Sequence, residues 1–310
     1  MALIILKQIL VMSIYMLIGY LLYKSGKITD EGSRSFAGIM AYIIIPSTVL
    51  TGLLVEYTPE RMKEFGLSFL MGLLTILIAI IISALIFRDS GMDCFAATFS
   101  NCGFIGIPLI RAAIGDAGVF YLVGLLISFN VLQWVYGMDL LRPGSGSGKK
   151  RTGMSPARFF RTPVVIAAIA GFAIFALRLG DRLPSVINDC VNGIAAMNAP
   201  FAMVVLGVYL AQSRISELFT TKRLYLVSAV RLIVIPLATV FALAFLPVSY
   251  NMKMTMIIAG AAPVGVNIAV YSQICDADYV YACKTVTQST LFSVVIMPLI
   301  ILIAELVVPH

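Results

Sequence analysis

Charged residues are scarce in this 310-residue sequence. Only 12% of the residues are Asp, Glu, Lys or Arg, whereas 60% are hydrophobic. Soluble domains contain about 25% charged residues, so this composition excludes an ordinary soluble protein. The sequence predicts an integral membrane protein whose main surroundings are the lipid bilayer. The net charge of +7 therefore gives no reason to expect a nucleic acid partner.

Residues that serve catalysis and metal binding are also few. The sequence has one histidine, His310, and its five cysteines show no CxxC or other metal-ligand spacing. It contains no HExxH motif and no convincing pair of catalytic side chains. We therefore expect neither an enzyme nor a cofactor or bound metal. Because the apolar segments lack clusters of carboxylates, the sequence leaves both H+ and Na+ open as a coupling ion.

Apolar runs long enough to cross a bilayer recur along the chain. They predict an all-α protein with ten transmembrane helices. The expected segments are residues 3–23, 36–55, 65–87, 93–114, 117–140, 163–179, 185–211, 224–247, 254–275 and 280–307. The hydrophilic run Pro143-Gly144-Ser145-Gly146-Ser147-Gly148 is typical of a flexible linker and divides the chain into two halves of five segments.

The two halves carry related sequences. Asp116-Ala117 at the start of the fifth segment recurs as Asp276-Ala277 before the tenth, and Pro46 and Pro200 interrupt the second segment of each half. Because each half has an odd number of spans, the second half must enter the membrane from the opposite side. The sequence thus predicts two inverted five-helix repeats, as in many alternating-access carriers. We expect Asp116 and Asp276 to cap the helices that they begin.

The distribution of basic residues sets the expected orientation. With the N-terminus outside, the cytoplasmic connections hold about twice as many Lys and Arg residues as the outer ones, as the positive-inside rule requires. We therefore expect a multi-pass protein of the plasma membrane, the inner membrane in a bacterium. Both termini would lie outside, and the central linker would lie in the cytoplasm.

Two apolar segments contain residues that break helices. The fourth holds the run Ser100–Pro108, and the ninth holds the run Gly260–Asn267, both rich in glycine and proline. Unwound backbone is tolerated in a membrane only where protein or a wet cavity surrounds it. Breaks at equal depth in two inverted halves therefore predict a substrate site where the segments cross. The alternative is a pair of kinked helices with packing glycines.

The chemistry of this crossing suits an anion. If Pro108 opens the second half of the fourth segment, free N–H groups and the positive end of a helix dipole point at the site. Asn101 and Asn267 add neutral amides that can orient a carboxylate. We expect substrate contacts from Asn101, Cys102, Gly103, Ile107, Pro108, Pro263, Val264, Gly265, Asn267 and Gln288.

Three basic residues lie in or beside the apolar segments. Lys284 and Arg111 are candidates for neutralising the substrate or for coupling. The alternatives are snorkelling for Lys284 and an interfacial anchor for Arg111. For Arg231 we expect the side chain to extend to the near membrane surface, and a buried cation that acts on the substrate or on a proton is the alternative.

The run Asn101–Leu109 resembles the fourth-helix motif of the auxin efflux carrier family, which includes plant PIN-formed carriers and bacterial carriers described for malonate and malate. Pro263–Asn267 and Met297-Pro298-Leu299 resemble the family's C-terminal pattern, and the short linker resembles its prokaryotic members. The resemblance implies a fold like that of bile-acid symporters, with crossed broken helices 4 and 9, elevator-type movement and a homodimer formed through the scaffold.

The resemblance also implies a domain organisation. Scaffold helices would lie in residues 1–62 and 163–217, transport-domain helices in 63–141 and 218–310, and the cytoplasmic linker in 142–162. The expected function is secondary active transport of a small organic anion, a mono- or dicarboxylate that includes auxin-like compounds. A channel or a substrate-sensing receptor on the same scaffold is the alternative.

Overall fold

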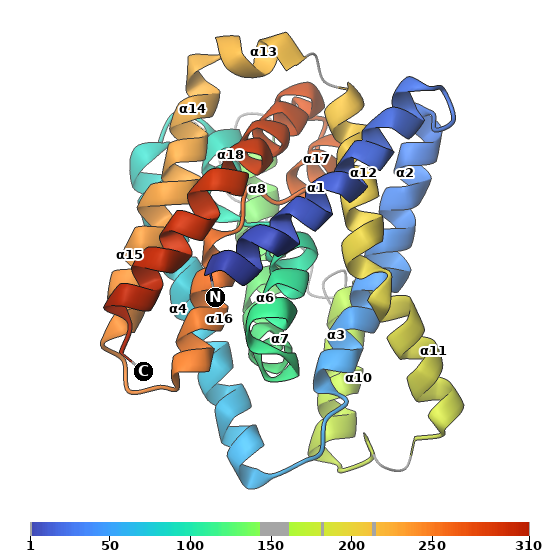
Figure 1. The fold of residues 1–310 in the computed structure, drawn as a ribbon, viewed down its shortest axis with the longest axis vertical. Helices are drawn as coiled ribbons and strands as arrows, with labels where there is room; N and C mark the ends of the chain where they lie inside the picture. Colours follow the sequence, from blue (N-terminus) through green and yellow to red (C-terminus); the bar gives the residue numbers. More distant parts are fainter. Residues whose placement is uncertain (1, 143–160, 181–182, 213–214, 310) are drawn as a thin grey trace.

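The computed structural model describes residues 2–142, 161–180, 183–212 and 215–309, so most of the predicted linker lies outside the described residues. Throughout these ranges the chain forms helices and no β-strand, and a single isolated bridge pairs Ser100 with Val264. The predicted all-α fold is confirmed (Figure 1).

The first half of the chain alternates long helices with short helices and π-helical turns. Its elements are α1 (Ala2–Lys24), α2 (Asp30–Ile39), the π-helical turn η1 (Met40–Ile44), α3 (Ile45–Leu53), α4 (Pro59–Ile86), α5 (Gly91–Thr98), η2 (Cys102–Gly106), α6 (Ile107–Ile114), α7 (Asp116–Leu132), η3 (Gln133–Gly137) and α8 (Met138–Leu141).

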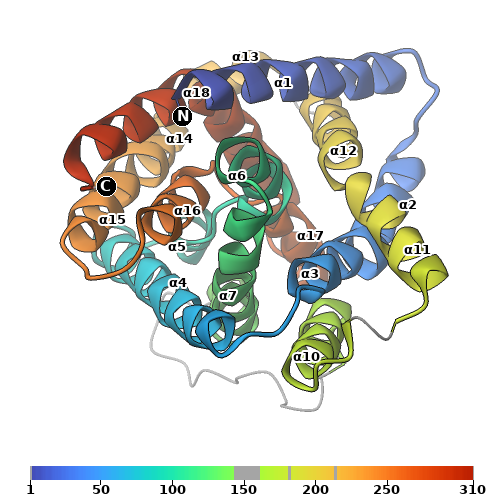
Figure 2. The ribbon, with the colours of Figure 1, turned by 60° about the horizontal axis from the view of Figure 1, so that its bottom comes forward.

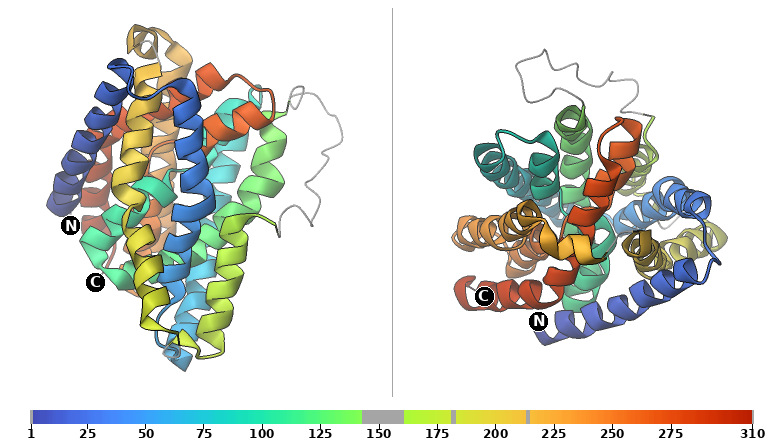
Figure 3. Two further views of the ribbon diagram at one scale, coloured as in Figure 1. Left: turned by 90° about the vertical axis from the view of Figure 1, so that its right-hand side faces the viewer. Right: turned by 90° about the horizontal axis from the view of Figure 1, so that it is seen from above.

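The second half has a similar succession. Its elements are α10 (Pro163–Ala176), α11 (Ser185–Ala196), α12 (Asn198–Gln212), α13 (Ile215–Thr220), α14 (Lys222–Ala229), η5 (Val230–Val234), α15 (Ile235–Ala244), α16 (Tyr250–Ala261), α17 (Asn267–Ile274) and α18 (Tyr279–Val307). Most of the longer helices run roughly along the long axis of the molecule (Figure 3), whereas α1 crosses it diagonally (Figure 1).

Seven helical stretches within the described ranges are long and apolar enough to cross a membrane. They are Leu6–Lys24, Asp30–Leu53, Pro59–Ile86, Asp116–Leu141, Ser185–Gln212, Lys222–Ala244 and Tyr279–Val307. The predicted fourth and ninth segments are missing from this set because both are broken into shorter helices. The predicted sixth segment is α10, an apolar helix of 14 residues.

Prolines explain three of the π-helical turns. Pro46, Pro108 and Pro236 each occupy the second position of a helix, α3, α6 and α15, and each helix directly follows a π-helical turn. A proline has no N–H to donate, and its ring crowds the carbonyl four residues earlier, so the preceding turn widens. Pro200 likewise lies just after the break between α11 and α12.

The helices form two groups (Figure 2). In one group α1 packs along α12, while α3 packs on α10 and α11. In the other, α4 packs along α7, and α16 lies against α7, α15 and α18. Contacts of α1 with α6 and α18 connect the two groups.

Glycine permits the close approach of α1 and α12. A Cβ added to Gly19 would collide with the carbonyl oxygen of Val204, and one added to Gly207 would collide with that of Met16. Reciprocal small residues of this kind let membrane helices pack backbone to backbone. Gly19 and Gly207 therefore allow α1 of the first half to pack closely against α12 of the second half.

Candidate functional site

The two broken segments cross and pair with each other. Helix α5 ends at Thr98 and α16 ends at Ala261. The N–H of Asn101 donates to the carbonyl of Pro263 over 2.7 Å, and the N–H of Gly265 donates to the carbonyl of Phe99 over 2.9 Å. The unwound backbones thus satisfy each other, which removes the main cost of breaking a helix inside a membrane.

Side chains hold this pairing in place. The Ser100 hydroxyl donates to the carbonyl of Ala259 over 2.9 Å. The Ser289 hydroxyl of α18 accepts from the N–H of Val264 over 3.1 Å. At Gly265 an added Cβ would lie only 3.0 Å from the carbonyl oxygen of Ser100, so a residue without a side chain is required there.

A cavity of about 330 Å³ lies beside the crossing and is lined by four of the predicted site residues, Asn101, Gly103, Gly265 and Asn267. Aromatic rings make up much of the remaining wall, together with one arginine of α2. These lining residues are Phe104, Phe129, Trp134, Tyr209, Tyr271, Tyr279 and Arg34. The cavity combines apolar walls with a few polar groups, as small-molecule sites usually do.

Polar donors at this site lack partners. Asn101 is 2% exposed, and its Nδ2 atom has no hydrogen-bond partner among the described residues. The same is true of the buried Trp134 Nε1 and Gln133 Nε2 atoms. Asn267 Nδ2 donates to Gln133 Oε1 over 3.1 Å, which connects the ninth segment to the end of the fifth. Buried donors without partners are rare in folded proteins and indicate room for an acceptor.

Ile107 and Pro108 lie away from this cavity. With Arg111 and Asn198 they line a second cavity of about 280 Å³. The break precedes Cys102, so the second half of this segment begins with η2, and Pro108 is the second residue of α6, which follows η2 directly. Proline is accommodated there by the wide π-helical turn before it.

Four other predicted residues contribute through their backbone, their side-chain bonds or their packing. Cys102 is fully buried at the start of η2. Pro263 and Val264 take part in the backbone bonds of the crossing, and neither lines the 330 Å³ cavity. Gln288 is also fully buried and lies behind the crossing, where its Oε1 accepts from Ser228 and its Nε2 donates to the carbonyl of Leu218.

Neither predicted coupling residue lines the 330 Å³ cavity. Arg111 forms an ion pair of 3.2 Å with Asp116, whose side chain is 89% exposed. Lys284 is half-buried on α18. An exposed pair such as Arg111–Asp116 is screened by solvent and adds little stability.

The expected helix caps are replaced by other residues. Gly115 occupies the cap position of α7, and Asp116 makes no side-chain capping bond. Asp278 caps α18 by accepting from the N–H of Tyr281 over 2.9 Å, while Asp276 lies in the preceding turn with a φ of 52°. The capping predictions for Asp116 and Asp276 are therefore wrong. Because Asp276 adopts a left-handed conformation, α18 begins later, and Asp278, two residues further along the chain, is its cap.

Of the two positions considered for Arg231, the structure shows the buried one. Its side chain is 1% exposed rather than extended to the membrane surface. It donates to the carbonyls of Ala97 and Thr98 at the end of α5, over 2.9 and 3.0 Å, and to the carbonyl of Gly260 near the end of α16. Because these acceptors come from distant segments, the isolated sequence of η5 gave no signal for them.

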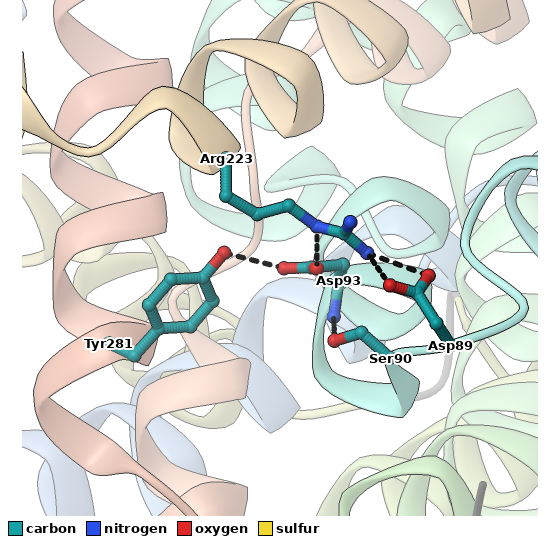
Figure 4. A network of polar contacts seen from close by, with 5 residues as sticks. All are labelled: Asp89, Ser90, Asp93, Arg223 and Tyr281. Carbon is teal, nitrogen blue, oxygen red and sulfur yellow. Dashed lines mark hydrogen bonds and ion pairs between the residues drawn. The ribbon is translucent and has the colours of Figure 1, made fainter.

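A further polar network ties together α5, α14 and α18 (Figure 4). Asp93, 2% exposed, accepts from Arg223 Nε over 2.7 Å and from the Tyr281 hydroxyl over 2.6 Å. Arg223 also bonds both carboxylate oxygens of Asp89, and this hydrogen bonding holds the pKa of the Asp89 carboxyl below its usual range. The network braces the helix group that contains the crossing.

A family model described as membrane transport protein matches residues 4–301. The chain belongs to this family. The match confirms the resemblance to the auxin efflux carriers that the motifs around Asn101 and Pro263 indicated. The chain is thus a membrane transporter with several apolar helices, and its family is one of transporters rather than enzymes.

Several curated proteins are similar over much of their length. An uncharacterized transporter of Methanothermobacter thermautotrophicus is 25% identical over 307 residues, covering 94% of this chain and 96% of that protein. An uncharacterized transporter of Methanocaldococcus jannaschii is 23% identical over 304 residues, with the same coverage. The uncharacterized transporter YfdV of Escherichia coli K12 is 28% identical over 165 residues, or 52% of this chain and 51% of that protein.

Proposed function

We propose that this transporter is a secondary active carrier for a small organic anion, bound in the 330 Å³ cavity at the helix crossing. The observation that carries the proposal is Asn101. Its backbone is paired across the crossing, yet its buried side-chain amide has no partner among the described residues. A carboxylate oxygen of the substrate could accept a hydrogen bond from this amide, so that no positively charged side chain is needed to hold it.

Other features of the cavity favour an anion of moderate size. The half-helices that begin at Cys102 and Asn267 both start at the crossing, and the first N–H groups of a helix have no acceptor within it. Their positive dipole ends favour negative charge. The unpartnered Trp134 Nε1 adds a third kind of donor. The aromatic walls suit an apolar portion of a mono- or dicarboxylate, including auxin-like compounds.

The proposed mechanism is elevator-type alternating access between two inverted repeats of five spans, with a fold like that of bile-acid symporters. The helices of residues 63–141 and 218–310 would carry the site, and those of 1–62 and 163–217 would form the scaffold. The backbone and side-chain bonds of the crossing support its movement as a unit. The scaffold would also form a homodimer.

The cavity is lined by Arg34 in the first half of α2, by Thr162 directly before α10 and by Tyr279 at the start of α18. With both termini outside the plasma membrane, these residues lie toward the cytoplasm. The conformation described would then be open to the inside.

The apolar outer face of α1, with Leu10, Ile14, Leu17 and Leu21 exposed, suits contact with lipid.

The first experiment is a thermal-shift screen of mono- and dicarboxylates on the purified protein, followed by counterflow of the stabilising compounds in proteoliposomes. Saturable counterflow that Asn101→Ala removes is the expected result. Binding without flux would identify a receptor instead, and unitary currents would identify a channel. If no carboxylate stabilises the protein or exchanges across the membrane, the proposal is wrong.

A further inference from the structure

The side of the crossing that carries Arg231 differs from the cavity side. Helices α5 and α16 both end at the crossing, and their last carbonyls converge on one guanidinium. The end of a helix carries a partial negative charge, so two such ends form an electronegative site inside the protein. Arg231 supplies the positive charge that this site requires.

The acceptors around Arg231 are the kind that bind alkali cations. Carbonyls of unwound backbone and of half-helix C-terminal ends coordinate Na+ in coupled carriers. Here three such carbonyls, those of Ala97, Thr98 and Gly260, accept from one guanidinium. The Thr98 hydroxyl, which lines the small cavity beside Arg231, is buried and has no partner among the described residues.

Little space remains beside the guanidinium. The adjoining cavity, lined by Thr98, Ser100, Arg231 and Gly260 among others, has a volume of about 10 Å³. That is about the space of one water molecule. A hydrated ion therefore has no room there as long as the arginine side chain is in place.

We propose that Arg231 is a resident cation that takes the place of a coupling Na+ at the crossing, so that the carrier works without Na+. An arginine guanidinium keeps its proton in proteins, so Arg231 is not a proton carrier either. Its role is to hold the ends of α5 and α16 together with a charge that never leaves. The prediction that transport needs no Na+ rests on the proposed carrier function. The prediction that Na+ binds only when Arg231 is removed does not depend on that function.

Lys253 provides a matched control. It is also a buried cation of the same helix group, 6% exposed, and its Nζ donates to the carbonyl of Ala244 over 2.9 Å. That carbonyl belongs to the end of a single helix, α15. Removal of Lys253 therefore leaves no set of converging carbonyls for Na+.

The binding test measures the melting temperature of the purified protein in NaCl and in choline chloride at equal ionic strength. We expect no Na+-specific shift for the wild type, for Arg231→Lys or for Lys253→Met. Arg231→Ala frees the three carbonyls, and Na+ should raise its melting temperature by about 3 °C or more. The proposal is overturned if Na+ specifically raises the melting temperature of the wild type. It is also overturned if Arg231→Ala folds and Na+ does not change its melting temperature. If Arg231→Ala does not fold, the wild type and Arg231→Lys decide.

The transport test uses the stabilising carboxylate in proteoliposomes, with Na+ replaced by choline on both sides. Wild-type uptake that is unchanged supports the proposal, and uptake that requires Na+ overturns it. Failure of the wild type to move any carboxylate contradicts the carrier function instead. The melting-temperature result then still decides whether Arg231 fills a cation site.

Discussion

The two sides of the helix crossing differ in whether their polar groups have hydrogen-bond partners. On the cavity side, the donors Asn101 Nδ2 and Trp134 Nε1 have no partner among the described residues. On the other side, the carbonyls of Ala97, Thr98 and Gly260 are all occupied by Arg231. The two broken segments contribute to both sides, and they are joined by Trp134 from η3 on the first and by Arg231 from η5 on the second.

The difference follows from the direction of the four half-helices. Two of them start at the crossing, beside the cavity lined by Asn101 and Asn267, while two end there with carbonyls that accept from Arg231. A helix break therefore creates one electropositive and one electronegative site at the same depth. Among the described residues the first side keeps donors without partners, and the carbonyls of the second are bonded to the Arg231 side chain.

The largest effect on this comparison is expected from Asn101→Ala. It removes the unpartnered amide, so transport should be abolished while the melting temperature stays close to that of the wild type. Asn198→Ala is the matched control, because Asn198 Nδ2 already donates to the carbonyl of Gly103 over 3.0 Å. Its loss should cost about 1 kcal/mol of stability. Normal counterflow by Asn101→Ala would contradict the assignment of the cavity as the substrate site.

Gly265→Ala should damage the crossing itself. Its Cβ would press on the carbonyl oxygens of Ser100 and Phe99, at 3.0 and 3.1 Å, where the two breaks pair. Overpacking of this kind costs about 1–3 kcal/mol and should lower the melting temperature. Gly103→Ala is the control, since nothing lies within 4 Å of its added Cβ. Equal melting temperatures for both variants would show that the crossing is not tightly packed.

Trp134→Phe tests the second donor of the cavity side. The ring is kept, but the indole N–H is lost, so binding of a carboxylate should weaken by about 1 kcal/mol, the typical net value of one hydrogen bond. Titration calorimetry with a stabilising carboxylate measures this change. An unchanged affinity would assign Trp134 a packing role only.

The smallest effect is expected from Arg111→Gln. Arg111 is 43% exposed and paired with an exposed carboxylate, so its loss should change stability by no more than about 0.5 kcal/mol. Counterflow should also be retained because Arg111 does not line the 330 Å³ cavity. A loss of transport in this variant would show that a second cation acts on the substrate path.

Features that depend on local sequence could be predicted well. The apolar segments fixed which stretches are helical, because a membrane requires each span to satisfy its own backbone bonds. Glycine and proline located both breaks to within a few residues, and Asn101, Gly103, Gly265 and Asn267 do line one cavity. The family membership was likewise evident from the motif around Asn101.

Features that depend on contacts between distant segments were predicted poorly. Gln288 and Pro108 share segments with true cavity residues, yet they face other helices. Asp276 resembles a helix cap in sequence, but a left-handed turn leaves that role to Asp278. The direction in which a side chain points depends on rotations and turns that a list of residues does not contain.

Arg231 shows the difference between what local sequence determines and what contacts between distant segments decide. The sequence by itself determined a helical membrane transporter with two broken segments, since hydrophobic length and the lack of a proline N–H act locally. Only the tertiary structure decided that the breaks pair through Ser100 and Val264 and that Arg231 lies buried between two helix ends. The physical reason is that a buried charge is tolerated only where partners surround it, and those partners come from α5 and α16.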